Sequence, residues 1–571
     1  MRRRDVRLAR AGKWWPRLLG WTLLLGAGVV ACSDEGRPGP PSDEPEPTRT
    51  PPAHDLAWST CSLLTGGSDS EAECAVTDLP LIGGDPDGPT IGVFVKRYSR
   101  TRTPRGQLWL LNGGPGGSSV DFEGVLSLFL DAAPDLEVYL IDHRGTGRSG
   151  RLNCGDLGPV PENPTLASIQ EHWSSCLDEI DEKWGPGLQG LSTTEAARDL
   201  GTLIGRSRHE LEEVYVYGVS YGTYWAQRYL QLYPDQADGI ILDSICPPGE
   251  CELISRFDES FDEVGRKLLE QCATLSSCAQ RLGQDPRGFL ENLYQKLDQG
   301  YCSEVGLSRR TFRQLLATML MYVGLRDYIP ATIFRLDRCE PADVSAIDSL
   351  MAYLDSELNL PDPYGSEVLT FHIGLSELVQ DPPPSYEDTV SHVEGLLFSL
   401  GVGPEFAALF DRWPRYQRDE YAGAFANTNI PMLMMSGEFD PQTPPEVSAP
   451  AQEHFVAAHQ TYVLVPWSAH TVLTQSPVDD IENVETCGML LIGQFLADPT
   501  LPLDTSCTNR VVGLDFDGHG PIATGSLFEQ VDTWDNPGLT ANTAVSALRA
   551  MPWSRWPTPA PTIRRSGPGP L

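Results

Sequence analysis

Basic residues are scarce in this sequence: 42 lysines and arginines stand against 78 aspartates and glutamates over 571 residues, for a formal net charge of −36. Seven of the basic residues and one aspartate fall within the first 32 positions, so the rest of the chain carries −42. A surface this acidic repels phosphate backbones and anionic headgroups. We therefore expect no nucleic-acid partner, whereas solubility and cationic substrates are both compatible with the charge.

Motifs for binding metals and phosphates are also missing. The sequence has no Cys-x-x-Cys pair and no cluster of histidines near its cysteines, which argues against a zinc site. The glycine-rich run at residues 112–118 lacks both the Gly-Lys-Ser/Thr ending of a P-loop and the Gly-x-Gly-x-x-Gly spacing of a dinucleotide site. We therefore expect neither a metal nor a nucleotide cofactor.

The amino-terminal segment has the pattern of an export signal. Its apolar run at 18–31 follows a basic leader and is too short to span a bilayer comfortably. The junction Val29-Val30-Ala31-Cys32 resembles a bacterial lipobox, in which the cysteine is acylated after cleavage; a plain signal with an unrelated cysteine is the alternative. We expect a lipoprotein signal peptide at 1–32, lipidation at Cys32 and a Pro-rich tether at 33–53. The protein is then extracytoplasmic in the bacterial cell envelope, periplasmic or surface-exposed, and meets the membrane through this lipid anchor alone.

The cysteine count agrees with export. Thirteen cysteines less Cys32 leave twelve, an even number that suits a compartment in which disulfides persist. Their order allows nearest-neighbour pairing throughout, with Cys487 to Cys507 as the leading candidate, although sequence alone does not fix connectivity. The twelve cysteines stand at 61, 74, 154, 176, 246, 251, 272, 278, 302, 339, 487 and 507.

Apolar, β-rich runs alternate with helical or loop stretches, which is typical of an α/β protein. Runs such as 240–242 and 432–435 are continuously apolar, as expected for a parallel sheet covered on both faces. The sequence therefore predicts a doubly wound, mostly parallel sheet with helices on each side. Strands are expected at 91–98, 108–111, 138–141, 214–217, 239–242, 431–435 and 462–465.

The stretch from 246 to 429 is too long for an ordinary crossover and is rich in helical patterns. We interpret it as a mainly helical cap inserted above the carboxyl ends of the strands, where open α/β sheets bind ligands. The catalytic core then comprises 54–245 and 430–510, and a C-terminal extension follows at 511–571, its Pro-rich end from about 553 expected to be disordered. Within the cap, helices are expected at 257–272, 289–297, 310–323 and 344–358.

Ser220 is the candidate nucleophile. It lies at the centre of Gly218-Val219-Ser220-Tyr221-Gly222, after an expected strand and before an expected helix at 224–230. This order is typical of a nucleophile elbow, in which the flanking positions must be glycine because side chains there would clash. Serines between glycines also occur in ordinary turns, so the strand and the helix carry much of the interpretation.

An activated serine needs a histidine as base and an acid that orients the histidine. Asp440 follows the expected strand 431–435, and His470 follows the last expected strand, 462–465. The order serine, acid, histidine, each just beyond a strand end, is the order used by α/β hydrolases. Competing acids are Asp243 and, more weakly, Glu438. Competing histidines are His454 and His459, both expected in the helix between the two strands, and His519, which lies well past the last strand.

Backbone donors for an oxyanion are expected in the glycine-rich run after the strand 108–111. Glycines there leave the N–H groups accessible. We assign one donor to Gly114, in preference to Gly113, and the other to Tyr221, the residue after the nucleophile.

Taken together, these motifs resemble the tripeptidyl and prolyl aminopeptidase branch of the α/β hydrolases. The resemblance covers about 85–510 and includes the Asp142 turn with Arg144 to Ser149. Asn112, where prolyl aminopeptidases usually carry histidine, points to the tripeptidyl side, as does the closing segment from Cys487 to Cys507. The resemblance implies an α/β-hydrolase fold with a helical cap, the triad Ser220, Asp440 and His470, and no cofactor or metal.

The resemblance further implies substrates with a free N-terminus, whose ammonium group needs a carboxylate from the cap or the pocket wall. Glu377 is the candidate, and an ordinary surface glutamate is the alternative. The leading hypothesis is a serine aminopeptidase that releases short peptides or single residues. A carboxylic ester hydrolase with the same triad is the second hypothesis, and a non-catalytic binding or scaffold protein is the third.

Overall fold

The computed structural model describes residues 56–535, except 86, 156, 158–163, 210–211, 359–362, 381, 482–484, 520 and 531. The expected signal peptide, the lipidation site Cys32 and the tether at 33–53 lie outside the described residues. So does the end of the C-terminal extension from 536 onward.

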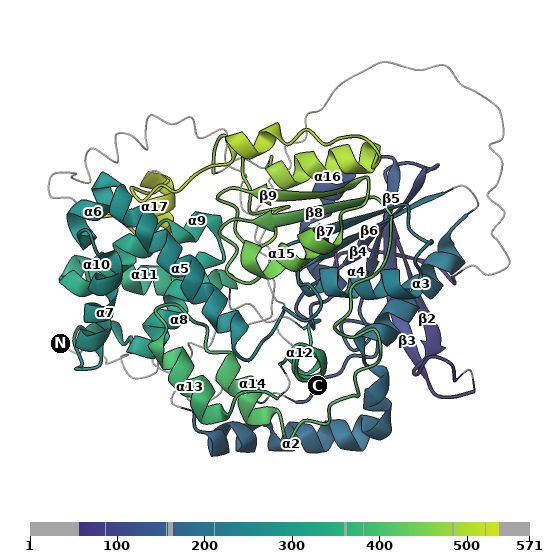
Figure 1. The fold of residues 1–571 in the computed structure, drawn as a ribbon, viewed down its shortest axis with the longest axis horizontal. Helices are drawn as coiled ribbons and strands as arrows, with labels where there is room; N and C mark the ends of the chain where they lie inside the picture. The colour runs from purple at the N-terminus through teal and green to yellow at the C-terminus, as the bar shows by residue number, and fades with distance from the viewer. Residues whose placement is uncertain are drawn as a thin grey trace, which may run out of the picture.

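One nine-stranded sheet forms the centre of the described chain, in the strand order β1-β2-β3-β5-β4-β6-β7-β8-β9 (Figure 1). Strands from β5 to β9 pair in parallel, whereas β1, β2 and β3 add an antiparallel edge. The bounds are β1 Ser59–Cys61, β2 Ala72–Pro80, β3 Thr90–Tyr98, β4 Gly106–Leu111, β5 Leu136–Ile141, β6 Glu213–Val219, β7 Gly239–Asp243, β8 Met432–Gly437 and β9 Gln460–Val465.

The seven expected strands correspond to β3 to β9, with β8 beginning at Met432 rather than at 431, which confirms the mostly parallel α/β sheet. Strands β1 and β2 were not expected. The sequence of β2 mixes charged residues and a proline with its apolar ones, and this strand, which lies next to the edge strand β1, is only partly buried. A disulfide between Cys61 and Cys74 joins these two strands at the edge of the sheet.

Helices cover both faces of the parallel strands (Figure 1). Alternate residues of one strand therefore enter different cores: Leu110 packs with Phe129 of α1 (Leu126–Ala132) and Leu491 of α16 (Cys487–Ala497), whereas Trp109 packs on the opposite face. That opposite face is covered by α3 (Thr193–Ser207) and α4 (Tyr221–Leu232). Burial of both faces explains why strands β4 to β8 are almost continuously apolar.

Between β7 and β8 the chain is helical, in the region where the sequence analysis expects a cap. These helices lie beside the sheet, and α2 (Leu166–Trp184), from the stretch between β5 and β6, packs beneath them (Figure 1). The four expected helices correspond to α5, α7, α8 and α11, and α8 ends before residue 323. The bounds are α5 Arg256–Thr274, α6 Ser276–Leu282, α7 Pro286–Leu297, α8 Arg309–Leu320, α9 Val323–Arg326, α10 Ile329–Arg338, α11 Pro341–Leu358, α12 Glu367–Glu377, α13 Tyr386–Gly395 and α14 Gly403–Leu409.

The described part of the C-terminal extension packs on these inserted helices. Its helix α17 (Pro521–Phe528) lies beside α11, among the helices farthest from the sheet (Figure 1). Arg335 of α10 donates to the carbonyl oxygens of Thr533 and Asp532 at 2.8 and 2.7 Å, and Arg338 pairs with Asp535 at 2.8 Å. The extension thus connects the end of the sheet domain to the far side of the inserted helices.

Six disulfides cross-link the described residues. Each joins one cysteine to the next cysteine along the chain, as nearest-neighbour pairing predicts, and Cys487 pairs with Cys507. Disulfides at this density indicate an extracytoplasmic protein. No helix of the described residues is both long enough and apolar enough to cross a bilayer. The pairs are 61–74, 154–176, 246–251, 272–278, 302–339 and 487–507.

Loss of the Cys487–Cys507 bridge should destabilise the fold. The bridge spans 20 residues, and both cysteines are buried at the start of α16 and in the following short turn. A cross-link of that span restricts the unfolded chain by about 3 kcal/mol. We expect Cys487→Ala/Cys507→Ala to lower the free energy of unfolding in urea by about that amount. The exposed Ser506→Ala should have little effect, and an unchanged urea midpoint in the double variant would contradict the role of the bridge.

Candidate active site

Ser220 lies in a strained turn between β6 and α4. Its backbone has φ 56° and ψ −127°, a region rarely occupied by residues other than glycine. A Cβ added to Gly218 would lie 2.3 Å from the carbonyl oxygen of Gly222, and one added to Gly222 would lie 2.2 Å from that of Leu111. The two flanking positions therefore require glycine, and the turn has the geometry of a nucleophile elbow.

Asp440 and His470 lie beyond the carboxyl ends of β8 and β9. Since β6 to β9 are neighbouring parallel strands, both residues lie at the same edge of the sheet as Ser220. Nδ1 of His470 lies 2.8 and 2.7 Å from the two carboxylate oxygens of Asp440. The structure therefore joins the acid and the histidine expected from the sequence in one buried pair.

The Asp440 carboxylate is held in its ionised form. Burial raises its pKa, but the His470 imidazole and hydrogen bonds from the backbone N–H groups of Thr443 and Gln442 outweigh burial, so the pKa lies below its usual value. The Thr443 hydroxyl contacts both groups, at 2.9 Å from Asp440 Oδ2 and 3.3 Å from His470 Nδ1. An ionised acceptor beside Nδ1 favours the tautomer with its proton there, which makes Nε2 the basic nitrogen.

Asp243, the main rival acid, connects the loop that carries His470 to the turn that carries Ser220. Its carboxylate accepts from the N–H groups of Val472 and Leu473 at 2.7 and 2.9 Å, and its carbonyl oxygen accepts from the N–H of Ser220 at 2.9 Å. The Tyr217 hydroxyl also donates to the Asp243 carboxylate, at 2.8 Å. Asp243 therefore ties the His470 loop to the nucleophile turn through the backbone.

The other rivals have partners elsewhere. Glu438 forms an ion pair with Lys267 at 3.0 Å. His454, at the end of α15 (Pro445–His454), contacts the carbonyl oxygen of Ala426, and His519 pairs with Asp327 beside α9 at 3.0 Å. The expectation that His459 lies in the helix is wrong: α15 ends at His454, and His459 has a positive φ of 67° in the turn before β9.

The glycine-rich loop after β4 lies against the nucleophile. A Cβ on Gly113 would lie 2.9 Å from Ser220 Cβ. The N–H of Gly113 donates to its neighbour Asn112 Oδ1 at 2.8 Å, whereas Gly114 lines the same pocket as Ser220 and Tyr221. These contacts favour Gly114 over Gly113 as a donor toward the pocket.

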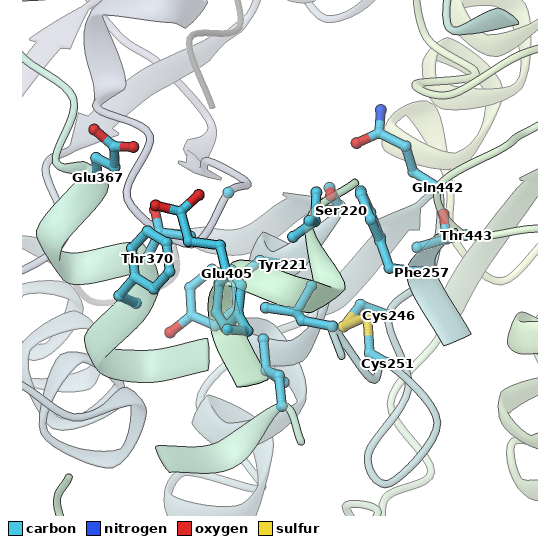
Figure 2. Close-up of a pocket in the computed structure, with 16 residues that line it drawn as sticks. Ser220, Tyr221, Cys246, Cys251, Phe257, Glu367, Thr370, Glu405, Gln442 and Thr443 are labelled. Carbon is cyan, nitrogen blue, oxygen red and sulfur yellow. A yellow bond between two sulfur atoms is a disulfide. The ribbon is translucent and has the colours of Figure 1, made fainter. Parts of the chain in front are cut away.

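A pocket with about 750 Å³ of empty space, part of it open to solvent, adjoins Ser220. Figure 2 shows Glu367, Thr370 and Glu405 on one side, Gln442 and Thr443 on the other, and Ser220 and Tyr221 between them. Most of the remaining wall is apolar. It is formed by the Cys246–Cys251 disulfide and by Leu253, Phe257, Phe371, Leu378, Val402 and Phe406.

Glu405 is a pocket residue that the sequence does not predict. It lies in α14, which no strong sequence pattern marks, and the indole N–H of Trp173 in α2 donates to it at 2.8 Å. Burial raises the pKa of Glu405 to about 7. Its partner is 232 residues away in the sequence, so only the fold brings the two together.

Glu377, the expected substrate-binding residue, lies in a different setting. Its buried carboxylate pairs with Arg228 at 2.7 Å and accepts hydrogen bonds from Tyr224 and Tyr416 at 2.6 and 2.5 Å. Arg228 and these hydrogen bonds outweigh burial and hold the pKa of Glu377 below its usual value. Glu377 is not among the residues that line the pocket beside Ser220, where the carboxylates are those of Glu367 and Glu405.

Family models match two segments of the chain. The model described as alpha/beta hydrolase fold matches residues 108–299, and the model described as TAP-like protein matches residues 403–507. The first segment contains Ser220, and the second contains Asp440 and His470. The fold and the resemblance expected from the sequence are thus confirmed.

Curated relatives align with about half of this chain, among them a tripeptidyl aminopeptidase and a serine protease. Tripeptidyl aminopeptidase from Streptomyces lividans is 26% identical over 266 residues, which are 42% of this chain and 48% of that protein. Serine protease Hip1 from Mycobacterium tuberculosis is 24% identical over 319 residues, 51% of this chain and 58% of that protein. The chain therefore spans about half the length of the curated relatives that it matches.

Among solved structures, proline iminopeptidase from Mycobacterium smegmatis aligns over 75% of this chain and 99% of that chain at 14% identity, with a TM-score of 0.31. A likeness at that score carries no argument about activity. The two family models cover strands on both sides of the inserted helices, and together with the curated relatives they support a TAP-like α/β hydrolase.

Proposed function

We propose that this protein is an exported serine exopeptidase that releases short peptides from the free N-terminus of peptide substrates through an acyl-enzyme intermediate. The observation that carries the proposal is the buried Asp440–His470 pair at the sheet edge where Ser220 occupies a nucleophile elbow beside a pocket. The named relatives, a tripeptidyl aminopeptidase and a serine protease, support a peptidase.

In this mechanism His470 Nε2 takes the proton of the Ser220 hydroxyl as its oxygen attacks the scissile carbonyl carbon. The N–H groups of Gly114 and Tyr221 stabilise the oxyanion that forms, and Asp440 stabilises the imidazolium. His470 then gives its proton to the leaving amine. Water, deprotonated by the same imidazole, hydrolyses the acyl-enzyme and frees Ser220.

The pocket supports a substrate with a cationic end. Two carboxylates, Glu367 and Glu405, stand on one wall, and the rest of the lining is mostly apolar. A pocket of this size accommodates a small peptide rather than a folded chain. We assign ammonium binding to Glu405 with Glu367, because these two carboxylates line the pocket that also contains Ser220.

An esterase with the same triad is the alternative, and substrate kinetics separate the two. We expect hydrolysis of tripeptide and dipeptide arylamides with a free N-terminus, and much slower hydrolysis of their N-acetylated forms. Turnover of p-nitrophenyl esters without any amide cleavage would establish the esterase instead. Absence of fluorophosphonate labelling at Ser220 would favour a non-catalytic binding protein.

Glu405→Gln should weaken the binding of free N-termini by about 10- to 100-fold, the effect of losing a hydrogen bond between charged groups. Because burial raises the pKa of Glu405 to about 7, the carboxyl group is neutral below that pH and anionic above it. The inhibition constant of a product tripeptide should therefore fall as the pH rises through 7 in the wild type, and stay flat in Glu405→Gln. The exposed Glu171→Gln on α2 is the matched control. If the inhibition constant depended on pH in the same way in the wild type and in Glu405→Gln, Glu405 would not be the residue that binds the ammonium group.

Cys32→Ser should release the protein from membranes. The lipobox-like junction at 29–32 motivates this prediction, since a single cysteine would carry the acyl chains. Membrane fractionation of cells expressing each form measures the effect. Unchanged fractionation of Cys32→Ser would exclude lipid anchoring at this position.

A further inference from the structure

Helix α12, which belongs to the inserted segment, is bonded to the glycine-rich loop at its amino-terminal end. The N–H of Ser366 donates to the carbonyl oxygen of Gly116 at 2.8 Å, and the Thr370 hydroxyl donates to that of Pro115. The approach is close: a Cβ on Gly116, whose φ is +106°, would lie 2.3 Å from the Ser366 carbonyl oxygen. Pro115 is the residue directly after Gly114.

The carboxyl-terminal end of the same helix is bonded to the elbow helix α4. Glu377 pairs with Arg228 at 2.7 Å, and the Tyr224 hydroxyl donates to Glu377 at 2.6 Å. The Glu377 and Arg228 side chains are only 1% and 2% exposed, so little water screens the pair. Helix α4 begins directly after Ser220, and its first residue is Tyr221.

One helix therefore contacts both elements that carry the oxyanion donors: the loop with Gly114 and the helix with Tyr221. The loop has few side chains of its own to fix it, because four of the five residues at 113–117 are glycine. Hydrogen bonds to its backbone groups must therefore hold its conformation, among them those that Ser366 and Thr370 donate to the carbonyl oxygens of Gly116 and Pro115. Donors displaced by even a fraction of an ångström lose much of their effect on a developing oxyanion.

We propose that α12 sets the spacing of the two oxyanion donors, with Thr370 and Glu377 as positioning residues. This inference rests on the proposed function, since it takes Gly114 and Tyr221 as donors. Glu377, expected from the sequence to bind substrate, would then act through Arg228 and the elbow helix. Helix α12 also lines the pocket through Glu367, Thr370 and Phe371, so the inserted segment shapes both the substrate site and the catalytic machinery.

The test compares Thr370→Val with a matched control, Thr389→Val. Both threonines are buried and donate to the carbonyl oxygen four residues earlier in their helix, but only Thr370 also donates to the glycine-rich loop. We expect Thr370→Val to lower kcat by about 10- to 100-fold on amide and ester substrates, because the loop loses a fixed contact. Thr389→Val should retain kcat.

A tripeptide boronic acid distinguishes positioning from simple pocket packing. Its tetrahedral adduct with Ser220 places an oxygen among the oxyanion donors, whereas a product tripeptide only occupies the pocket. We expect Glu377→Gln to weaken boronate inhibition by about the same factor as kcat, with product inhibition unchanged. Thr370 also lines the pocket, so Thr370→Val should weaken boronate inhibition by about the same factor as kcat and product inhibition by much less. Equal loss of product and boronate affinity, or unchanged kcat in Thr370→Val, would overturn the inference.

Failure of the proposed function would look different. A wild-type protein that cleaves esters alone would refute the peptidase assignment but leave this comparison intact, since the same donors serve ester hydrolysis. A wild-type protein that reacts with neither substrates nor fluorophosphonates would refute both. If Thr370→Val unfolds, which circular dichroism detects, Glu377→Gln supplies the same readouts.

Discussion

Ser220→Ala will eliminate fluorophosphonate labelling and lower kcat for peptide arylamides by a factor on the order of 10⁶, as expected when the nucleophile of a serine hydrolase is removed. The reason is chemical: the alanine side chain has no hydroxyl group for His470 to deprotonate. KM should change little, because the substrate is held by the pocket rather than by the Ser220 hydroxyl. Steady-state kinetics and mass spectrometry of the labelled peptide measure both effects.

The control is Ser175→Ala, an exposed serine on α2. Its kinetics should match those of the wild type, which shows that mutagenesis and purification preserve activity. Labelling that persists in Ser220→Ala would assign the nucleophile to another serine. Full arylamide activity without labelling at position 220 would reject the acyl-enzyme mechanism.

The sheet and the residues at its edge were accessible from the sequence because local signals agree with the fold there. Strands buried on both faces are continuously apolar, so β6 and β8 are evident from a few residues, and the glycines at 218 and 222 mark the elbow between strand and helix. Asp440 and His470 are predicted because each lies just beyond the end of one of the last two expected strands. Their meeting at 2.7 Å requires only that neighbouring parallel strands end at one edge.

The pocket wall was not accessible in the same way. Glu405 and Trp173 come from helices α14 and α2, and no sequence pattern relates two residues 232 positions apart. The sequence offers Glu377 as a candidate carboxylate of the inserted segment, whereas its partner Arg228 lies in the elbow helix, 149 residues earlier. Packing of the inserted helices decides which carboxylates meet the pocket and which form ion pairs beneath it.

Asp440→Asn should lower kcat by about 10⁴-fold with little change in KM. An amide in place of the carboxylate can donate to Nδ1, which favours the tautomer with its proton on Nε2. That nitrogen then cannot accept the proton of Ser220. The exposed Asp131→Asn, which alters an ion pair with Arg100 on the surface, is the control and should be fully active.

The same substitution separates Asp440 from Asp243 and has a distinct pH signature. Since the folded-state pKa of Asp440 is depressed, its ionised form stabilises the fold above the unfolded pKa near 3.8, and this contribution disappears as the pH falls through the folded pKa. Asp440→Asn should therefore be less stable than the wild type in urea at pH 7, and the difference should shrink toward pH 3. For Asp243 the pH dependence has the opposite sign. Burial raises its pKa, so its carboxyl group stabilises the fold in the neutral form at low pH, and this contribution is lost as the pH rises. If Asp440→Asn kept its activity while Asp243→Asn lost it at unchanged stability, the orienting acid would be Asp243, and the bonds from Asp440 to His470 would be structural.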